Sequence, residues 1–116
     1  MAADATRIDQ GVSLIEQRLS PAAILLYGSV VTGGLRLDSD VDIAVLLGTG
    51  AVDPFELASL RTDVEAVIGR DVDLVVLDSA SPIIAMEVVR HHRIIHNRRP
   101  DLLERFVVKT LGAYFD

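Results

Sequence analysis

The sequence predicts an α/β or α+β domain in which helices pack against a small mixed β-sheet. Segments with apolar residues at helical spacing alternate with short apolar runs that are typical of strands. Half of the 116 residues are hydrophobic and 24% are charged, which provides enough apolar surface for a core. Because no internal repeat or linker is visible, we expect residues 1–116 to form a single domain.

The first part of the chain predicts a helix followed by two strands. Residues 6–19 have the apolar spacing of a helix, which ends at a Ser-Pro pair. Residues 22–27 form a continuous apolar run, as expected for a strand buried on both faces. A short helical turn and a loop over residues 35–39 then lead into a second strand over residues 41–47.

The clearest predicted helix lies after this second strand. Asp53 is the expected N-cap, Pro54 suits the first helical position, and Gly69 ends the helix. An apolar stripe runs along the segment. Its members are Leu57, Leu60, Val64, Val67 and Ile68.

The last third of the chain predicts a strand, two helices and one ambiguous segment. Residues 72–77 are rich in β-branched residues and indicate a third strand. A helix is expected from residue 83 to about residue 90, and residues 93–96 suit either a small edge strand or a loop. Pro100 begins a final helix with an apolar face. That face consists of Leu102, Leu103, Phe106, Val107 and Leu111.

The composition excludes several classes of protein. Eleven basic and seventeen acidic residues give a net charge of −6, which disfavours direct nucleic-acid binding. The chain has no cysteine, so it has neither disulfides nor a thiolate metal site, as is usual in a reducing compartment. Its N-terminus lacks a signal sequence, and its apolar runs are too short to cross a bilayer. We therefore expect a cytoplasmic protein without a membrane partner.

Paired acidic residues at the start of the second strand predict a metal site. Alternate residues of a strand share a face, so Asp40 and Asp42 project the same way with α-carbons roughly 6.6 Å apart. Two carboxylates held this close repel each other unless a cation or a proton intervenes. Oxygen ligands favour Mg²⁺ or Mn²⁺ over zinc.

A third carboxylate is expected from the next strand. We favour Asp73, which lies within the hydrophobic run, where an ionised group is costly unless it is paired or bound to metal. Asp71 lies at the exposed start of the strand but shares the same face, so the pattern also admits Asp71.

Gly28 and Ser29 follow the first strand and are separated from Asp40 by ten residues. A glycine lets a phosphate approach the backbone, and the serine hydroxyl and N–H groups can donate hydrogen bonds to it. A phosphate-binding turn facing three acidic groups is the minimum for phosphoryl or nucleotidyl transfer assisted by two metal ions.

This arrangement resembles the polymerase-β nucleotidyltransferase superfamily. The local string is GSVVTGGLRLDSDVDIAVLL. Together with the short chain length and the run VDLVVLDSASPIIAMEVVRHHRIIH, it resembles the minimal nucleotidyltransferase (MNT) antitoxins of HEPN/MNT toxin–antitoxin systems. The resemblance covers most of the chain.

The resemblance implies a function and a role for five residues. An antitoxin of this kind transfers AMP from ATP to a tyrosine hydroxyl of a partner HEPN toxin and so silences it. By the family pattern Gly28 and Ser29 hold the triphosphate, while Asp40 and Asp42 bind two Mg²⁺ ions, or Mn²⁺ in their place. Asp73 completes the metal site and helps to deprotonate the attacking hydroxyl.

One departure from the pattern leaves an alternative function open. Many relatives carry a basic residue where this chain has Thr32, and only Arg36 is nearby to replace it. The alternative is an antitoxin that neutralises its toxin by direct binding, with a weak or vestigial nucleotide site. Transfer of the nucleotide to a small molecule or an RNA end ranks third, because the acidic charge disfavours RNA.

Overall fold

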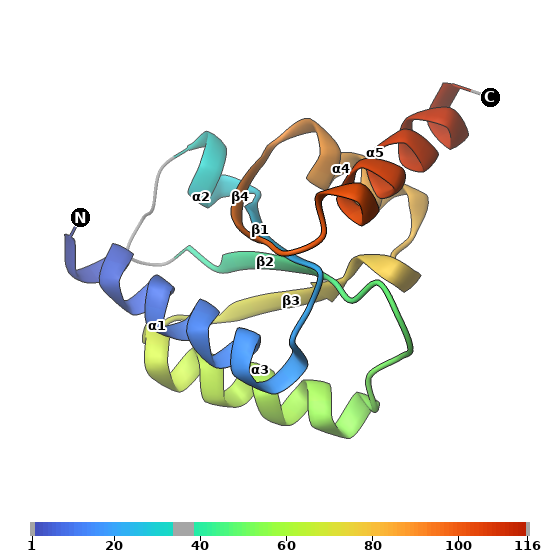
Figure 1. The fold of residues 1–116 in the computed structure, drawn as a ribbon. Helices are drawn as coiled ribbons and strands as arrows, with labels where there is room; N and C mark the ends of the chain where they lie inside the picture. Colours follow the sequence, from blue (N-terminus) through green and yellow to red (C-terminus); the bar gives the residue numbers. More distant parts are fainter. Residues whose placement is uncertain (1, 34–38, 116) are drawn as a thin grey trace.

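The computed structural model describes residues 2–33 and 39–115 (Figure 1). Its centre is a four-stranded mixed sheet with the order β3-β2-β1-β4. β1 (Ala23–Tyr27) pairs antiparallel with both β2 (Val41–Leu46) and β4 (His92–Asn97), whereas β3 (Val72–Val76) pairs parallel with β2. The predicted fold class is therefore confirmed, and β3 and β4 form the two edges.

Helices cover both faces of the sheet. α1 (Ala2–Leu19) and α3 (Pro54–Ile68) lie side by side on one face, while α4 (Pro82–Arg90) and α5 (Pro100–Phe115) lie on the other (Figure 1). The four-residue helix α2 (Ser29–Thr32) directly follows β1, and a 3₁₀ turn over Leu77–Ser79 joins β3 to α4. The sheet is thus the middle of three layers.

Strand alternation divides the core into two clusters. Ile24 and Leu26 of β1 point toward α1 and α3, whereas Ala23, Leu25 and Tyr27 point toward α4 and α5. Every side chain of β1 is buried, which confirms the prediction of a strand covered on both faces.

α3 matches its prediction closely. Asp53 Oδ1 accepts a hydrogen bond from the Phe55 N–H at 2.8 Å, Pro54 occupies the first turn, and Gly69 ends the helix with a φ of 79°. Of the predicted stripe, Leu60, Val64 and Ile68 are buried, whereas Val67 is exposed.

Other predicted elements differ from the structure at their ends. α1 begins at Ala2 rather than Thr6, and Leu77 belongs to the 3₁₀ turn rather than to β3. The ambiguous segment over residues 93–96 is an edge strand. The apolar face of α5 is covered only in part, since Leu103 is its one buried side chain among the described residues. The predicted loop at residues 35–38 lies outside the described residues.

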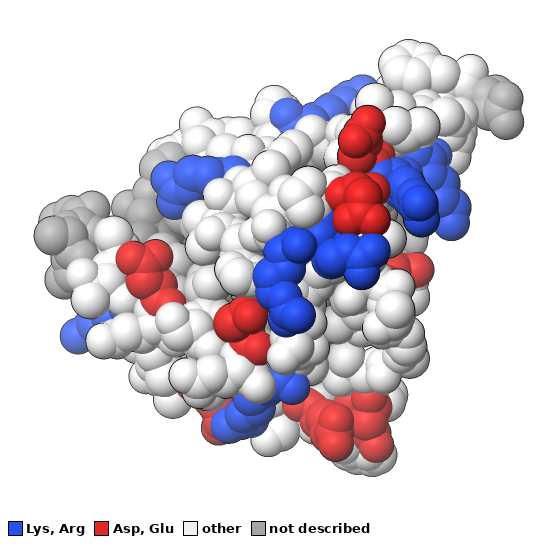
Figure 2. All heavy atoms as spheres, viewed as in Figure 1, with Lys and Arg blue, Asp and Glu red and all other residues white. Residues whose placement is uncertain are grey.

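Charged groups on the surface are mixed. On the face in Figure 2, several Lys and Arg side chains follow a diagonal across the middle of the view, with Asp and Glu side chains beside them. None of the helices in the described part of the chain is both long and apolar enough to span a membrane.

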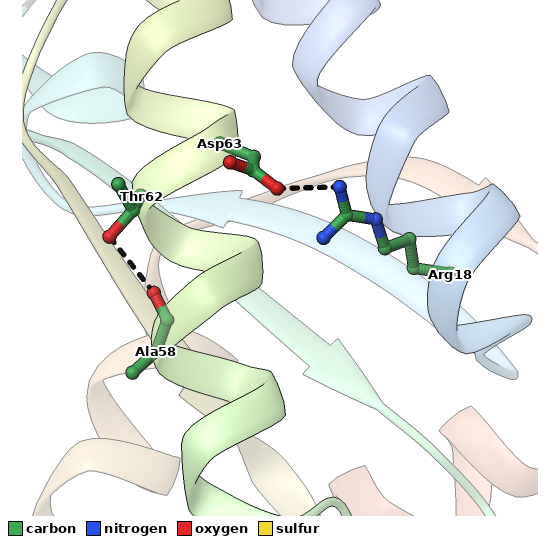
Figure 3. A network of polar contacts seen from close by, with 4 residues as sticks. All are labelled: Arg18, Ala58, Thr62 and Asp63. Atoms are coloured by element: carbon green, nitrogen blue, oxygen red, sulfur yellow. Dashed lines mark hydrogen bonds and ion pairs between the residues drawn. The ribbon is translucent and has the colours of Figure 1, made fainter.

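α1 and α3 are held together mainly by close packing. Arg18 of α1 reaches Asp63 of α3 at 2.5 Å, while Thr62 donates a hydrogen bond to Ala58 within α3 (Figure 3). The ion pair is about half exposed, and such surface pairs contribute little stability. By contrast, Gly11 of α1 is buried, and a Cβ atom there would lie 2.7 Å from Ile68 Cδ1.

Two glycine substitutions test this packing. Gly112→Ala on α5 adds its methyl group to open space and should gain up to about 1 kcal/mol of helix propensity. Gly11→Ala gains the same propensity but must displace the packed Ile68 side chain, and overpacking costs roughly 1–3 kcal/mol. In urea unfolding we expect Gly11→Ala to be the less stable variant by at least about 1 kcal/mol. Equal stabilities would show that the close approach of α1 to α3 does not require a glycine at position 11.

Candidate functional site

Tyr27, Asp42 and Asp73 form one row across three strands. The strand register pairs Tyr27 of β1 with Asp42 of β2, and Asp42 with Asp73 of β3. Because alternate residues share a face, this row lies on the side of the sheet that carries α4 and α5. The Tyr27 hydroxyl donates a hydrogen bond to Asp73 Oδ2 at 3.2 Å.

The Gly28-Ser29 turn lies directly beside this row. Gly28 has φ 72° and ψ −148°, a conformation that is essentially restricted to glycine. A Cβ atom at this position would collide with Asp42 Oδ2. The absence of a side chain at position 28 therefore lets the Asp42 carboxylate approach the backbone of the turn.

Burial and nearby negative charges together raise the pKa of Asp42. Burial makes the largest contribution, and the negative charges of Asp73, Asp40 and Glu87 add to it, so the pKa rises from 3.8 to about 6. The charged form of Asp42 is thus disfavoured in this site unless a positive charge is brought to it.

The three predicted acidic residues occupy different environments. Asp40 is exposed and immediately precedes β2, while Asp42 is half buried. Asp73 lies within β3, as predicted, but its side chain is exposed rather than buried, at the start of an edge strand. Asp73 rather than Asp71 is in register with Asp42, and the Asp71 carbonyl accepts a hydrogen bond from the Val41 N–H at 2.9 Å.

The start of β3 is fixed from the opposite face of the sheet. Glu65 of α3 accepts a hydrogen bond from the Val72 N–H at 2.9 Å through its side-chain Oε2 atom. Val72 immediately precedes Asp73, so this contact anchors the backbone that carries the third carboxylate.

The donor chemistry of the three predicted acidic residues fits Mg²⁺ or Mn²⁺. Asp40, Asp42 and Asp73 offer only oxygen ligands. Burial and the neighbouring negative charges disfavour the charged form of Asp42, which a bound cation would stabilise. Within residues 2–33 and 39–115, however, no three His, Asp or Glu side chains already lie close enough to form a metal centre. The carboxylates would therefore have to converge when a cation binds.

Ser29 and Thr32 follow Gly28 closely along the chain. Ser29 is exposed and begins α2, and Thr32 Oγ1 donates a hydrogen bond to the Gly28 carbonyl at 3.2 Å. The sequence leaves open whether Arg36 replaces the basic residue that is missing at Thr32, and Arg36 lies outside the described residues.

Sequence reasoning missed Tyr27 and Glu87. Tyr27 was interpreted only as the end of a buried strand, although a hydroxyl next to Gly28 was a usable signal. Glu87 lies on the exposed face of α4, where nothing in the local pattern connects it to β2. It borders an open groove of about 400 Å³ between α4 and α5, beside the exposed side chains of Ile83 and Tyr114.

Comparison with known proteins identifies relatives of this chain. The model of the family described as "Polymerase beta, Nucleotidyltransferase" matches residues 11–101. Protein adenylyltransferase MntA of Shewanella oneidensis is 35% identical over 91 residues, which cover 78% of this chain and 64% of that protein. The match thus spans less than two thirds of this relative's length.

Solved structures of toxin–antitoxin complexes share the fold. A crystal structure of a toxin–antitoxin with AMP-PNP matches with a TM-score of 0.83 and 30% identity, covering 92% of this chain and 86% of that one. A tri-AMPylated Shewanella oneidensis HEPN toxin in complex with its MNT antitoxin matches with a TM-score of 0.80 and 27% identity, covering 96% and 86%. Together with the family match over most of its length, these similarities show that the chain belongs to the polymerase beta nucleotidyltransferase family.

Proposed function

We propose that this chain is a Mg²⁺-dependent protein adenylyltransferase that transfers AMP from ATP to a tyrosine hydroxyl of a HEPN-type toxin. It would thereby act as the antitoxin in a hetero-oligomeric complex. One observation carries the proposal: the Asp42 carboxylate lies against Gly28, and Asp73 is in register beside it. A phosphate bound at the Gly28-Ser29 turn would therefore be adjacent to the acidic row.

The relatives support this activity. One is named a protein adenylyltransferase, and another was solved as an antitoxin bound to an AMPylated HEPN toxin. A third structure of a toxin–antitoxin contains AMP-PNP, which is an ATP analogue. We infer the same partner and the same nucleotide for this chain, and we treat residues 1–116 as one nucleotidyltransferase domain that works in the cytoplasm.

Each site residue has a role in this reaction. Gly28 and Ser29 would bind the triphosphate, and Asp40, Asp42 and Asp73 would hold two Mg²⁺ ions, for which Mn²⁺ could substitute. The bound cations would supply charge neutralisation at the triphosphate and the leaving diphosphate.

The transfer itself exchanges one phosphorus–oxygen bond for another. Asp73 accepts the proton of the tyrosine hydroxyl, whose oxygen attacks the α-phosphorus of ATP. The bond from the α-phosphorus to the bridging oxygen of the β-phosphate breaks, and diphosphate leaves.

A second candidate function is neutralisation by direct binding. It is favoured by the lack of a preassembled group of three metal-binding side chains among the described residues, and by Thr32 in the place of a basic residue. In that case the nucleotide site would be weak or vestigial.

Intact-mass measurement of the toxin distinguishes the two functions. After incubation with this protein, ATP and Mg²⁺, we expect the toxin to gain the mass of one or more AMP groups, with the modification mapped to tyrosine by fragmentation. Asp42→Ala should abolish the gain, because it removes a carboxylate from the centre of the row.

A cellular assay with the same variant completes this test. If transfer silences the toxin, Asp42→Ala should fold and bind the toxin yet fail to protect cells. A stable complex that protects without any mass change would favour direct binding instead.

The contact between Gly28 and Asp42 leads to a second prediction. Gly28→Ala should displace the Asp42 carboxylate and strain the turn, lowering the transfer rate on the order of 100-fold, as expected for misplaced catalytic groups. Gly50→Ala is a matched control, because Gly50 also has a φ of 72° but open space around its Cβ position. Equal rates for the two variants would refute a specific role of the Gly28 contact.

The raised pKa of Asp42 predicts a pH-dependent change in stability. The folded chain holds this proton more tightly than the unfolded chain, so ionisation of Asp42 lowers stability as the pH rises from about 4 through about 6. Without divalent cations, Asp42→Asn should therefore raise the melting temperature at pH 8, and the gain should shrink toward pH 5. A gain at Asp42 that is independent of pH would contradict this assignment.

A further inference from the structure

The Tyr27 hydroxyl bridges two of the three strands that build the site. Tyr27 lies on β1 and Asp73 on β3, with β2 between them. Neighbouring strands are about 4.8 Å apart, so the contact spans roughly 10 Å of sheet. The Tyr27 hydroxyl nevertheless donates a hydrogen bond to Asp73 Oδ2 at 3.2 Å. Tyr27 is also in register with Asp42 on the intervening strand β2.

Filling the core does not require this hydroxyl. The Tyr27 ring is 3% exposed and belongs to the same apolar cluster as Leu25 and Val88. A phenylalanine would provide nearly the same packing volume. What distinguishes tyrosine is a hydrogen-bond donor at the far end of the ring, and buried hydroxyls of this kind are normally paired.

The surrounding charges keep this hydroxyl in its donor form. Burial and the carboxylates of Asp73 and Asp42 raise the pKa of Tyr27 well above its usual range. Any tyrosine hydroxyl carries its proton at neutral pH, and the geometry makes this one a donor to Asp73.

We propose that Tyr27 is a positioning residue of the nucleotidyltransferase site, which orients the Asp73 carboxylate through this hydrogen bond. Asp73 belongs to an exposed edge strand, where few neighbouring groups restrict its side chain. The bond to a buried, rigid ring fixes one of its oxygens and so restricts the direction in which the other can bind a cation. This inference rests on the proposed function. Within that function, Tyr27 acts only through Asp73.

Two tyrosine variants separate positioning from general packing. The chain contains two tyrosines, and each hydroxyl takes part in one hydrogen bond to a charged side chain: Tyr27 with Asp73, and Tyr114 with Arg90 at 2.9 Å. Tyr27→Phe and Tyr114→Phe therefore remove equivalent groups, one at the site and one at the end of α5. The primary readout is the affinity for Mn²⁺ alone, measured by calorimetry or electron paramagnetic resonance without nucleotide.

We expect Tyr27→Phe to weaken Mn²⁺ binding about tenfold, in keeping with the loss of one hydrogen bond to a charged group. Tyr114→Phe should leave the affinity unchanged, and both variants should melt near the temperature of the wild-type chain. In the transfer assay, excess Mg²⁺ should restore most of the rate of Tyr27→Phe, which a packing defect would not allow.

A double-mutant cycle tests whether Tyr27 acts through Asp73. In an Asp73→Ala background, Tyr27→Phe should cause no further loss of Mn²⁺ affinity, because the hydrogen-bond acceptor is already absent. Additive losses would overturn the proposal, as would equal affinities of Tyr27→Phe and Tyr114→Phe or an absence of Mn²⁺ binding by the wild-type chain.

The two readouts also separate this inference from the proposed function. Mn²⁺ affinity that depends on Tyr27 through Asp73, in a protein that transfers no AMP, would uphold the positioning role and reject the transferase. Efficient transfer with no effect of Tyr27→Phe on Mn²⁺ affinity or on the Mg²⁺ dependence of the rate would uphold the transferase and reject the positioning role of Tyr27.

Discussion

The contact between the Asp42 carboxylate and the backbone of Gly28 is the constraint on which the rest of the site depends. It requires a residue without a side chain at the end of β1, in a conformation that only glycine adopts readily. It also requires β2 to pair with β1 in the register that brings Asp42 opposite Tyr27. A slip of one residue would turn Asp42 to the face covered by α1 and α3, and would separate it from the turn.

The apolar core makes this crowded arrangement tolerable. Burial of Asp42 beside other carboxylates disfavours its charged form, as its raised pKa indicates. The two clusters on either side of the sheet supply the opposing stabilisation, since burial of large apolar side chains is the dominant favourable term in folding. The site lies at the sheet end where β1 finishes and β2 and β3 begin, so its charges stay near solvent while the strands beneath them remain buried.

Local sequence patterns predicted the features that depend on residues close together in the chain. The caps and apolar stripe of α3 identified that helix, and strand alternation placed Asp40 and Asp42 on one face. The alignment of Asp73 with Asp42 and the reach of Tyr27 across β2 depend on which strands pair, which is a long-range property. The exposure of Asp73 was mispredicted for the same reason, because an apolar sequence such as that of β3 does not reveal that the strand lies at an edge.

In the proposed function, the acidic character of the site would couple nucleotide binding to cation binding. A triphosphate at Gly28-Ser29 would enter the field of Asp40, Asp42, Asp73 and Glu87 on a chain whose net charge is −6. Repulsion opposes binding of the nucleotide alone, whereas a divalent cation is attracted both to the carboxylates and to the phosphates. The described side chains do not form a complete metal centre. The phosphates of the nucleotide would therefore add ligands for the cation, and the cation would bind the phosphates. Cation and nucleotide binding would then be thermodynamically linked, and each would raise the affinity of the chain for the other by the same factor.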